Sequence, residues 1–441
     1  MSRERKHGAV RLRRVLKCAG PLLLAMSPAA WAQEQQASWG LDLGVRYTDN
    51  VGRVDVDEQS ETVGIAGLRF AFDVDRPRLD GRAAADLRYQ EYFDNTFDSD
   101  VNGGLDALLS FALVPERFVW VVQDNYGQVA RDRQVADNPA NRQDINYFST
   151  GPDLTLPLGS QTTFQASGRY SDEYFEGSNQ DSTNLLGSAA LVRQVSTAIA
   201  VSLNGSYSEE DFDADEVFVD YEVTQAFLRL ALTGARTTLS LDGGASRVEQ
   251  DGGAKSESAL ARLEFTRLIG ARSSLRLAAG TTPSNTAQTF RRDQEFGGVD
   301  VGPDGAVVVG DASQADYAYL TFTTDWQRSA FTATLSGRSD DHEVFDEFNR
   351  DQYRATLTYT RELTRNVSLD VRGTYLEEEF TETGFAFDQW GAGLGMRWQL
   401  SPQFSLRASV DHFVGSSDDG SRDYTENRGY IGITYASGGG Q

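Results

Sequence analysis

The sequence contains few of the residues on which disulfide, metal and acid–base sites depend. Its 441 residues include one cysteine, Cys18, and three histidines. A single cysteine excludes a disulfide framework and a cysteine-based metal site. The motifs GxSxG and HExxH and the phosphate-binding loop are also absent from the sequence. We therefore expect neither an enzyme nor a cofactor-binding protein.

Positive charge and long apolar runs are scarce as well. Lys and Arg number 41 against 65 Asp and Glu, which gives a net charge of −24. Nucleic-acid-binding proteins need a basic surface, so nucleic acid is excluded as a partner. Beyond the N-terminal segment, no stretch approaches the roughly 18 consecutive apolar residues of a membrane-spanning helix. A hydrophobic content of 39% with 11% aromatics argues against a disordered chain.

The N-terminal segment has the composition of a secretory signal peptide. Basic residues from Arg3 to Lys17 precede the apolar stretch "CAGPLLLAMSPAA" (18–30), and "AWA" (30–32) fits the small-x-small cleavage rule. Cys18 lies before the apolar core, which does not fit a lipoprotein anchor. We expect residues 1–32 to be cleaved, so that the mature chain contains no cysteine.

Period-two alternation dominates the rest of the chain. In "FSLRASVDHF" (404–413), Phe404, Leu406 and Val410 fall on one face, and polar residues such as Arg407 fall on the other. Such alternation indicates a strand with one apolar and one polar face. About twenty segments of this kind (18–22) follow one another, which predicts an all-β protein.

The connections between these segments alternate between two types. Short turns such as "LVPERF" (113–118) and "LSPQ" (400–403) alternate with long acidic loops such as those within 209–217 and 340–350. Transmembrane barrels have short periplasmic turns and long extracellular loops, and only helices and closed barrels satisfy every backbone group in a bilayer. We predict an antiparallel up-and-down transmembrane β-barrel with both termini in the periplasm. A soluble periplasmic β protein is the structural alternative.

This interpretation divides the chain into four parts and places it in a membrane. The signal peptide (1–32) is followed by a short periplasmic segment (33–37), the barrel (38–436) and a C-terminal tail (437–441). The expected location is the outer membrane of a Gram-negative bacterium, with its lipid and lipopolysaccharide as partners. Tyrosines precede the acidic loops in segments such as "RYSDEYF" (169–175), and rings of this kind form interfacial girdles. The predicted girdle residues are Tyr89, Tyr170, Tyr207 and Tyr375.

The polar faces of the strands are rich in charge. Two interpretations remain open: a charged wall that orders water and polar solutes, or cross-strand ion pairs that hold the register. A barrel of this size leaves a polar, water-filled interior unless loops fill it. The residues predicted to line the pore are Arg46, Arg88, Arg169, Arg338, Arg354, Arg372, Arg407, Asp370 and Asp411.

Two weaker candidate sites involve acids and histidines. Asp211, Asp213, Asp215 and Glu222 have the spacing of an EF-hand loop, but Glu216 stands where that loop needs glycine. Loose binding of divalent cations is the most that we expect there. His342 and His412 are the only imidazole bases beyond the signal segment. His412 shares its strand face with lipid-facing apolar residues, which leaves an outer-membrane lipid hydrolase as a remote alternative, without a recognisable triad.

Two further segments depart from simple alternation. Residues 283–316 contain Pro303, Asp304 and Gly305 between short apolar runs, which predicts a small hairpin that constricts or caps the lumen. The alternation also slips in "VTQAFLRLAL" (223–232) and "ETVGIAGLRF" (61–70). There we expect bulges or positions at the upper rim of the barrel.

Several motifs resemble one family. "YTDNV" (47–51), "LVPERFVWVVQDNYGQV" (113–129) and the repeated Y-x-x-D/E-x-F rims resemble outer-membrane β-barrel proteins of exopolysaccharide and exosortase (PEP-CTERM) loci. The resemblance implies a conduit or accessory in the production or export of surface polysaccharide, with export machinery as a partner. A general porin for small solutes and a structural or adhesive barrel with cation-bridging loops remain alternatives. The C-terminal "ASGGGQ" (436–441) departs from the aromatic end of most barrels.

Overall fold

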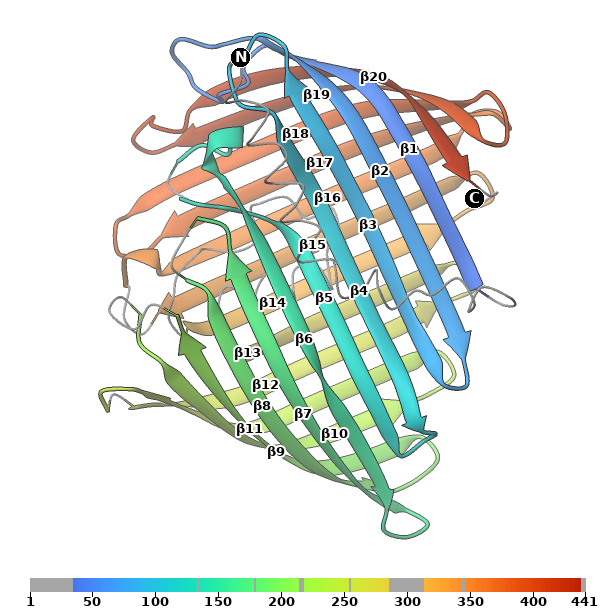
Figure 1. Ribbon diagram of the computed structural model, residues 1–441, viewed down its shortest axis with the longest axis vertical. Coiled ribbons are helices and arrows are strands. Elements are labelled where there is room, and N and C mark those ends of the chain that lie inside the picture. The colour runs from blue at the N-terminus through green and yellow to red at the C-terminus, as the bar shows by residue number, and fades with distance from the viewer. Residues whose placement is uncertain are drawn as a thin grey trace.

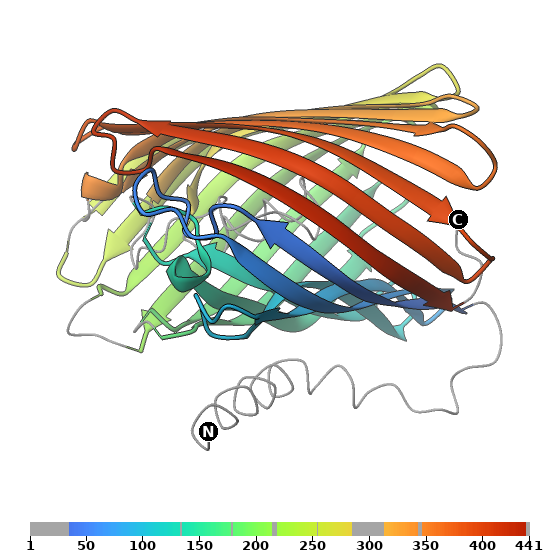
Figure 2. The same cartoon turned by 90° about the horizontal axis from the view of Figure 1, so that it is seen from above.

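The computed structural model describes residues 35–132, 135–177, 180–213, 218–253, 255–284, 313–342 and 346–437. Within these ranges, twenty antiparallel strands form one sheet in which each strand pairs with its neighbours in sequence. β1 (Gln35–Thr48) also pairs with β20 (Tyr424–Ser437), and this pairing closes the barrel seen in Figures 1 and 2. The predicted fold class and strand number are confirmed.

The remaining elements follow in chain order. They are β2 (Glu61–Arg76), β3 (Leu79–Tyr92), β4 (Asp100–Val114), β5 (Phe118–Ala130), η2 (Pro139–Asn141), β6 (Arg142–Pro157), β7 (Thr162–Phe175), β8 (Ser182–Gln194), β9 (Ile199–Phe212), β10 (Tyr221–Thr233), β11 (Thr237–Gln250), β12 (Lys255–Ile269), β13 (Ser273–Ser284), β14 (Ser313–Asp325), β15 (Ser329–His342), η3 (Asp346–Phe348), β16 (Arg350–Glu362), β17 (Val367–Phe380), β18 (Phe385–Gln399) and β19 (Phe404–Ser417). No helix in the described ranges is long and apolar enough to cross a bilayer.

The period-two pattern sorts side chains between the two faces of the wall. On β1, Leu41 and Leu43 are 45% and 60% exposed on the outer face, while Asp42 between them points to the other side. Directly paired residues share a face, so the register carries this sorting from strand to strand. Leu41, for example, stands opposite Leu68, which is also exposed. The barrel therefore has an apolar outer surface and a largely polar inner surface.

The connections differ in length between the two ends of the barrel. At the end that holds Gln35 and Ser437 they are short, for example residues 77–78 between β2 and β3 or 400–403 between β18 and β19. At the other end they include residues 49–60 and 131–141. We call the second end the mouth. That it faces the cell exterior remains a prediction.

One part of the wall departs from a regular ladder. β4 pairs with β5 from Val114–Phe118 to Leu105–Tyr126, and there the pairing stops. Residues 100–104 of β4 pair only with β3, and residues 127–130 of β5 pair only with β6. Figure 1 shows β5 curving away from β4 toward the mouth.

The segments that leave the wall are buried on both faces. Beyond the ladders with β4 and β7, Val129 on one face is 1% exposed and Ala130 on the other face is 3% exposed. A strand in a barrel wall normally exposes its outer face, as Leu185 does on β8 at 60%. The ends of β5 and β6 (residues 127–132 and 135–144) therefore fold into the barrel, and we call them the inward hairpin.

The prediction of bulges in residues 61–70 and 223–232 is wrong. β2 and β10 pair without interruption with both of their neighbours. The alternation slips because apolar residues occupy inner positions. Val63 packs inside with Val51 and Tyr92, and Phe227 lies inside beneath Arg262 at 4.7 Å. The hairpin expected around Pro303 lies outside the described residues.

Candidate functional site: the lumen of the barrel

All nine residues predicted to line the pore lie on the strand face opposite the apolar belt. The register brings three of them together, because Arg372 lies 3.5 Å from Asp370 on its own strand and 3.1 Å from Asp411. The other six are spread around the wall. Arg46 donates to Gln90 at 2.9 Å, and Arg88 contacts Asp86 at 2.9 Å. Their role in a pore remains a prediction.

A charged wall extends from β17 through β20 to β3. Asp42 lies at its centre and accepts hydrogen bonds from Thr434, at 2.6 Å, and from Tyr430. Arg69 approaches the same carboxylate at 3.5 Å. These contacts join neighbouring strands, as the cross-strand interpretation expects. Asp42 is therefore tied into the wall by its neighbours, while Arg372 on the same side remains 47% exposed.

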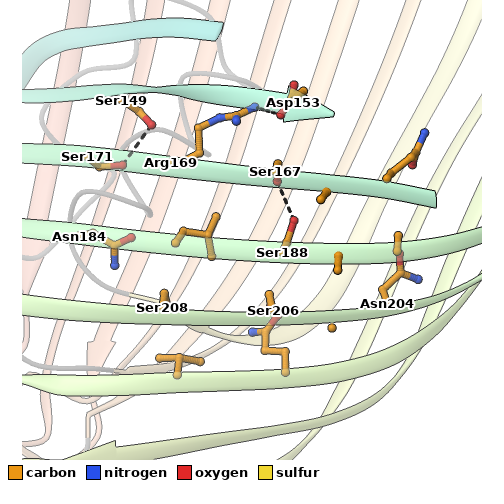
Figure 3. Close-up of a pocket in the computed structure, with 18 of the residues that line it drawn as sticks. Ser149, Asp153, Ser167, Arg169, Ser171, Asn184, Ser188, Asn204, Ser206 and Ser208 are labelled. Carbon is orange, nitrogen blue, oxygen red and sulfur yellow. Dashed lines mark hydrogen bonds and ion pairs between the residues drawn. The ribbon is translucent and has the colours of Figure 1, made fainter. Parts of the chain in front are cut away.

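The opposite wall, from β6 to β10, is mainly neutral. It carries a cavity of about 800 Å³ (Figure 3) lined by hydroxyl and amide side chains. They include Ser149, Ser167, Ser171, Ser188, Asn204 and Ser206. The neutral wall was not predicted from the sequence, because serine at alternate positions is typical of any polar strand face.

The charges at this cavity are paired with one another. Arg169 contacts Asp153 at 2.6 Å. Arg229 and Arg262 share the carboxylate of Asp242, at 2.6 and 3.1 Å. The carboxylates thus neutralise guanidinium groups that line the cavity. The surface that remains is rich in groups that both donate and accept hydrogen bonds.

A buried ion cluster lies at the mouth. Arg53, in the connection between β1 and β2, contacts Glu426 at 3.0 Å and Asp137 at 2.9 Å. Its guanidinium lies 5.6 Å from the Phe413 ring centre and 5.3 Å from that of Tyr424. Asp137 belongs to the inward hairpin, so Arg53 joins that hairpin to β20 and to the connection between β1 and β2.

The electrostatics of this cluster favour the ionised state. Burial alone raises the pKa of a carboxyl. The guanidinium groups of Arg142 and Arg53 outweigh burial and hold the pKa of Asp137 well below its ordinary value. Asn138 adds a hydrogen bond from its side-chain amide to the Gly52 carbonyl, at 3.4 Å. The inward hairpin is therefore fastened at neutral pH by charge-assisted and neutral contacts.

A second buried cluster lies on the inner face of β15 to β17. Arg350, 1% exposed, contacts Glu378 at 2.5 Å and Asp340 at 3.3 Å. Arg338, one of the predicted pore residues, contacts the same Asp340 at 2.6 Å. Arg338 is 6% exposed, so its charge is committed to this cluster and is shielded from solvent.

The four predicted girdle tyrosines lie on the outer face. Tyr89, Tyr170, Tyr207 and Tyr375 are between 40% and 46% exposed. Tyr375 donates to Glu377 at 2.9 Å, and Tyr89 contacts Glu91, so each of these rings has a carboxylate neighbour on the mouth side. This placement fits an amphipathic ring at a membrane interface. The interfacial role itself remains a prediction.

The remaining candidates do not converge on a metal or catalytic site. No group of three or more His, Cys, Asp or Glu in the described part of the chain could hold a metal ion. Asp215 lies outside the described residues. His412 Nδ1 is 2.8 Å from Asn427 Oδ1, and its ring lies 5.2 Å from that of Trp390 on the outer face.

Comparisons with known proteins agree with the barrel. A family model described as "Putative beta-barrel porin 2" matches residues 351–437, which correspond to β16 to β20. No curated protein sequence matches the chain.

Solved structures with a similar outline share little sequence. The ferric enterobactin receptor PfeA of Pseudomonas aeruginosa has 10% identity and a TM-score of 0.44, over 91% of this chain and 81% of that one. The FrpB iron transporter of Neisseria meningitidis has 9% identity and a TM-score of 0.43, over 91% and 82%. A loop-deletion mutant of OmpT, an outer membrane protein of Vibrio cholerae, has 10% identity and a TM-score of 0.33, over 92% and 100%. The chain is thus a closed twenty-stranded barrel of the kind found in outer-membrane proteins, and its last five strands are similar to a family of β-barrel porins.

Proposed function

We propose that this barrel is a non-enzymatic conduit or accessory for a surface polysaccharide, in the outer membrane of a Gram-negative bacterium. The observation that carries the proposal is the neutral wall of hydroxyl and amide groups on β6 to β10. Polyhydroxylated chains exchange hydrogen bonds with water, and such a wall can replace those bonds without an ionic anchor. The resemblance of the rim motifs to proteins of exopolysaccharide loci supports the same proposal.

In this proposal the inward hairpin limits the size of the chain that passes through the lumen. It occupies part of the mouth, so it narrows the path along the lumen. Transport proteins use elements of this kind to limit the size of what passes. Export machinery on the periplasmic side and divalent cations at the acidic loops are partners in this proposal.

A general porin for small solutes is the second candidate. The charged wall around Asp42 and Arg372 favours it, because ordered charges along one side of a lumen tune the passage of small ions. The match to a porin family is the second support. A structural or adhesive barrel with a closed interior is the third.

A clean deletion of the gene, scored for surface polysaccharide, tests the proposal. We expect the deletion to reduce surface polysaccharide and a plasmid copy to restore it. Purified barrel should also conduct in planar bilayers. Normal polysaccharide with strong, unselective conductance would establish the general porin. Normal polysaccharide without conductance would leave the structural barrel.

A further inference from the structure

The neutral wall presents its polar groups as a regular array. Ser149, Ser171, Ser188 and Ser206 come from four consecutive strands, β6 to β9, and all line the same cavity. Neighbouring strands are about 4.8 Å apart, so the hydroxyl groups form rows across the wall. Serine is small, and the cavity of about 800 Å³ lies over these rows (Figure 3). That volume falls within the usual range of small-molecule pockets, roughly 300–1,000 Å³.

The hydrogen-bonding capacity of the array is only partly used within the protein. Ser167 and Ser188 share one hydrogen bond at 2.6 Å, and Ser171 donates to Ser149 at 3.1 Å. A hydroxyl has one proton and two lone pairs, so the half-buried Ser167 and Ser188 can still accept from a ligand, whereas Ser149 and Ser171 are only 4% and 2% exposed. The Nδ2 atom of Asn204 already donates to Ser202 Oγ, at 2.9 Å, so Asn204 offers its amide oxygen to a ligand. A ligand with many hydroxyl groups has the complementary capacity.

Charge at the cavity disfavours an anionic ligand. Arg169 is committed to Asp153, and Arg229 and Arg262 are committed to Asp242. The lining also includes the carboxylates of Asp153 and Glu173. The three guanidinium groups are matched by three carboxylates, those of Asp153, Asp242 and Glu173, so the cavity has no net positive charge for a carboxylated or phosphorylated ligand. Selection against such a ligand therefore arises because it loses its hydration without gaining a compensating charge.

We propose that this cavity is a binding subsite for an uncharged, polyhydroxylated solute the size of a short oligosaccharide. The proposal rests on the proposed function and makes it more specific, because it selects neutral over acidic glycans. Binding is weak and reversible, as a conduit requires. Individual neutral hydrogen bonds contribute about 1 kcal/mol each.

Isothermal titration calorimetry on the detergent-solubilised barrel tests the subsite directly, whether or not the channel conducts. The probes are maltotriose, which is neutral, and trigalacturonate, which has three carboxylates. We expect maltotriose to bind at least about tenfold more tightly than trigalacturonate, in line with a difference of about 1.4 kcal/mol. Equal binding of the two, tighter binding of trigalacturonate or no binding of maltotriose would overturn the proposal.

Two substitutions localise the binding. Ser188→Ala and Asn204→Leu remove polar groups without adding side-chain heavy atoms, and each should weaken maltotriose binding about fivefold, the value of one hydrogen bond. Thr356→Val removes a hydroxyl from an inner-face position of β16, away from the cavity, and should leave binding unchanged. If Asn204→Leu does not fold, Ser206→Ala replaces it. Unchanged binding in the cavity variants, or an equal loss in Thr356→Val, would refute the location.

The two proposals fail in different ways. Selective, variant-sensitive binding of maltotriose in a barrel whose deletion leaves surface polysaccharide normal would retain the subsite and reject the polysaccharide role. Loss of polysaccharide on deletion without any maltotriose binding would retain the polysaccharide role and reject the subsite.

Discussion

Arg53 and Asp137 are 84 residues apart in sequence, yet Arg53 Nη1 lies 2.9 Å from Asp137 Oδ2. Their side chains are 7% and 11% exposed, so the ion pair is shielded from water. One residue belongs to the connection after β1 and the other to the inward hairpin. Asp137 also contacts Arg142, at 2.9 Å, but Arg142 belongs to β6, so Arg53 is the residue that links Asp137 to the connection after β1.

Arg53→Gln should therefore release the inward hairpin. Asp137 and Glu426 would keep Arg142 and Arg428, but they would lose the guanidinium that they share and that links the hairpin to β20. We expect a larger and noisier single-channel conductance in planar bilayers than for the unaltered barrel. Arg247→Gln is the matched control, because Arg247 also pairs with two acids but is 53% exposed. The same conductance change in both variants would contradict the role of Arg53.

Acid should release the same contact. The pKa of Asp137 is lowered in the folded barrel, so its contribution to stability is complete above the unfolded value, about 3.9. That contribution disappears as the pH falls through the lower, folded value. Conductance should stay constant from pH 7 down to about 4 and rise only below it.

Asp137→Asn provides the control for this titration. Asparagine cannot ionise, so the acid-dependent step in conductance should disappear in this variant. A step in the unaltered barrel between pH 5 and 6 would show that another group controls the hairpin.

The buried cluster on β15 to β17 should matter more for stability than the exposed charges of the lumen. Arg350→Met leaves Glu378 and Asp340 buried without their shared guanidinium, and we expect a loss of about 3 kcal/mol in the free energy of unfolding. Arg372→Gln removes a charge whose side chain is 47% exposed, and the expected loss is below about 1 kcal/mol. Guanidinium titration of the barrel in lipid vesicles, followed by tryptophan fluorescence, measures both. Similar losses would mean that burial does not separate the two clusters.

Cysteine labelling can establish which end of the barrel faces the outside. The only cysteine, Cys18, lies in the predicted signal peptide, so an introduced cysteine would be the one labelled position in the mature chain. Ser421→Cys lies in a mouth connection and Gln403→Cys in a short turn, and both positions are exposed. A membrane-impermeant maleimide on intact cells should label the first and spare the second. The opposite pattern would invert the predicted orientation.

The sequence predicts the barrel well because its physical rule is local. The alternation of Leu41, Asp42 and Leu43 is recognised from adjacent residues alone. The difference between short turns and long loops can also be read directly from the sequence. The inward hairpin is not local in this sense. Ala130 occupies an outer position by parity, and nothing in a linear pattern shows that this end of β5 has left the wall.

The candidate site was predictable only in part for the same reason. The inner position of Arg372 follows from alternation, but the carboxylate that neutralises it, Asp411, becomes its neighbour only through two intervening strand pairings. Arg338 also has the inner parity of a pore residue. Its burial beside Asp340 depends on the packing of three strands, and parity does not reveal it.

The interrupted ladder between β4 and β5 has a consequence for the surrounding membrane. Residues 101–104 of β4 turn one edge of their backbone toward a neighbour that has moved inward, and Gly103 has a φ of +137° there. Hydrocarbon offers no hydrogen bonds to such an edge. Val101, at this edge, pairs with Tyr89 and so lies level with the predicted interfacial girdle, where water and lipid head groups can satisfy the backbone. The side of the barrel at β4 is therefore the one whose backbone depends on the head-group layer.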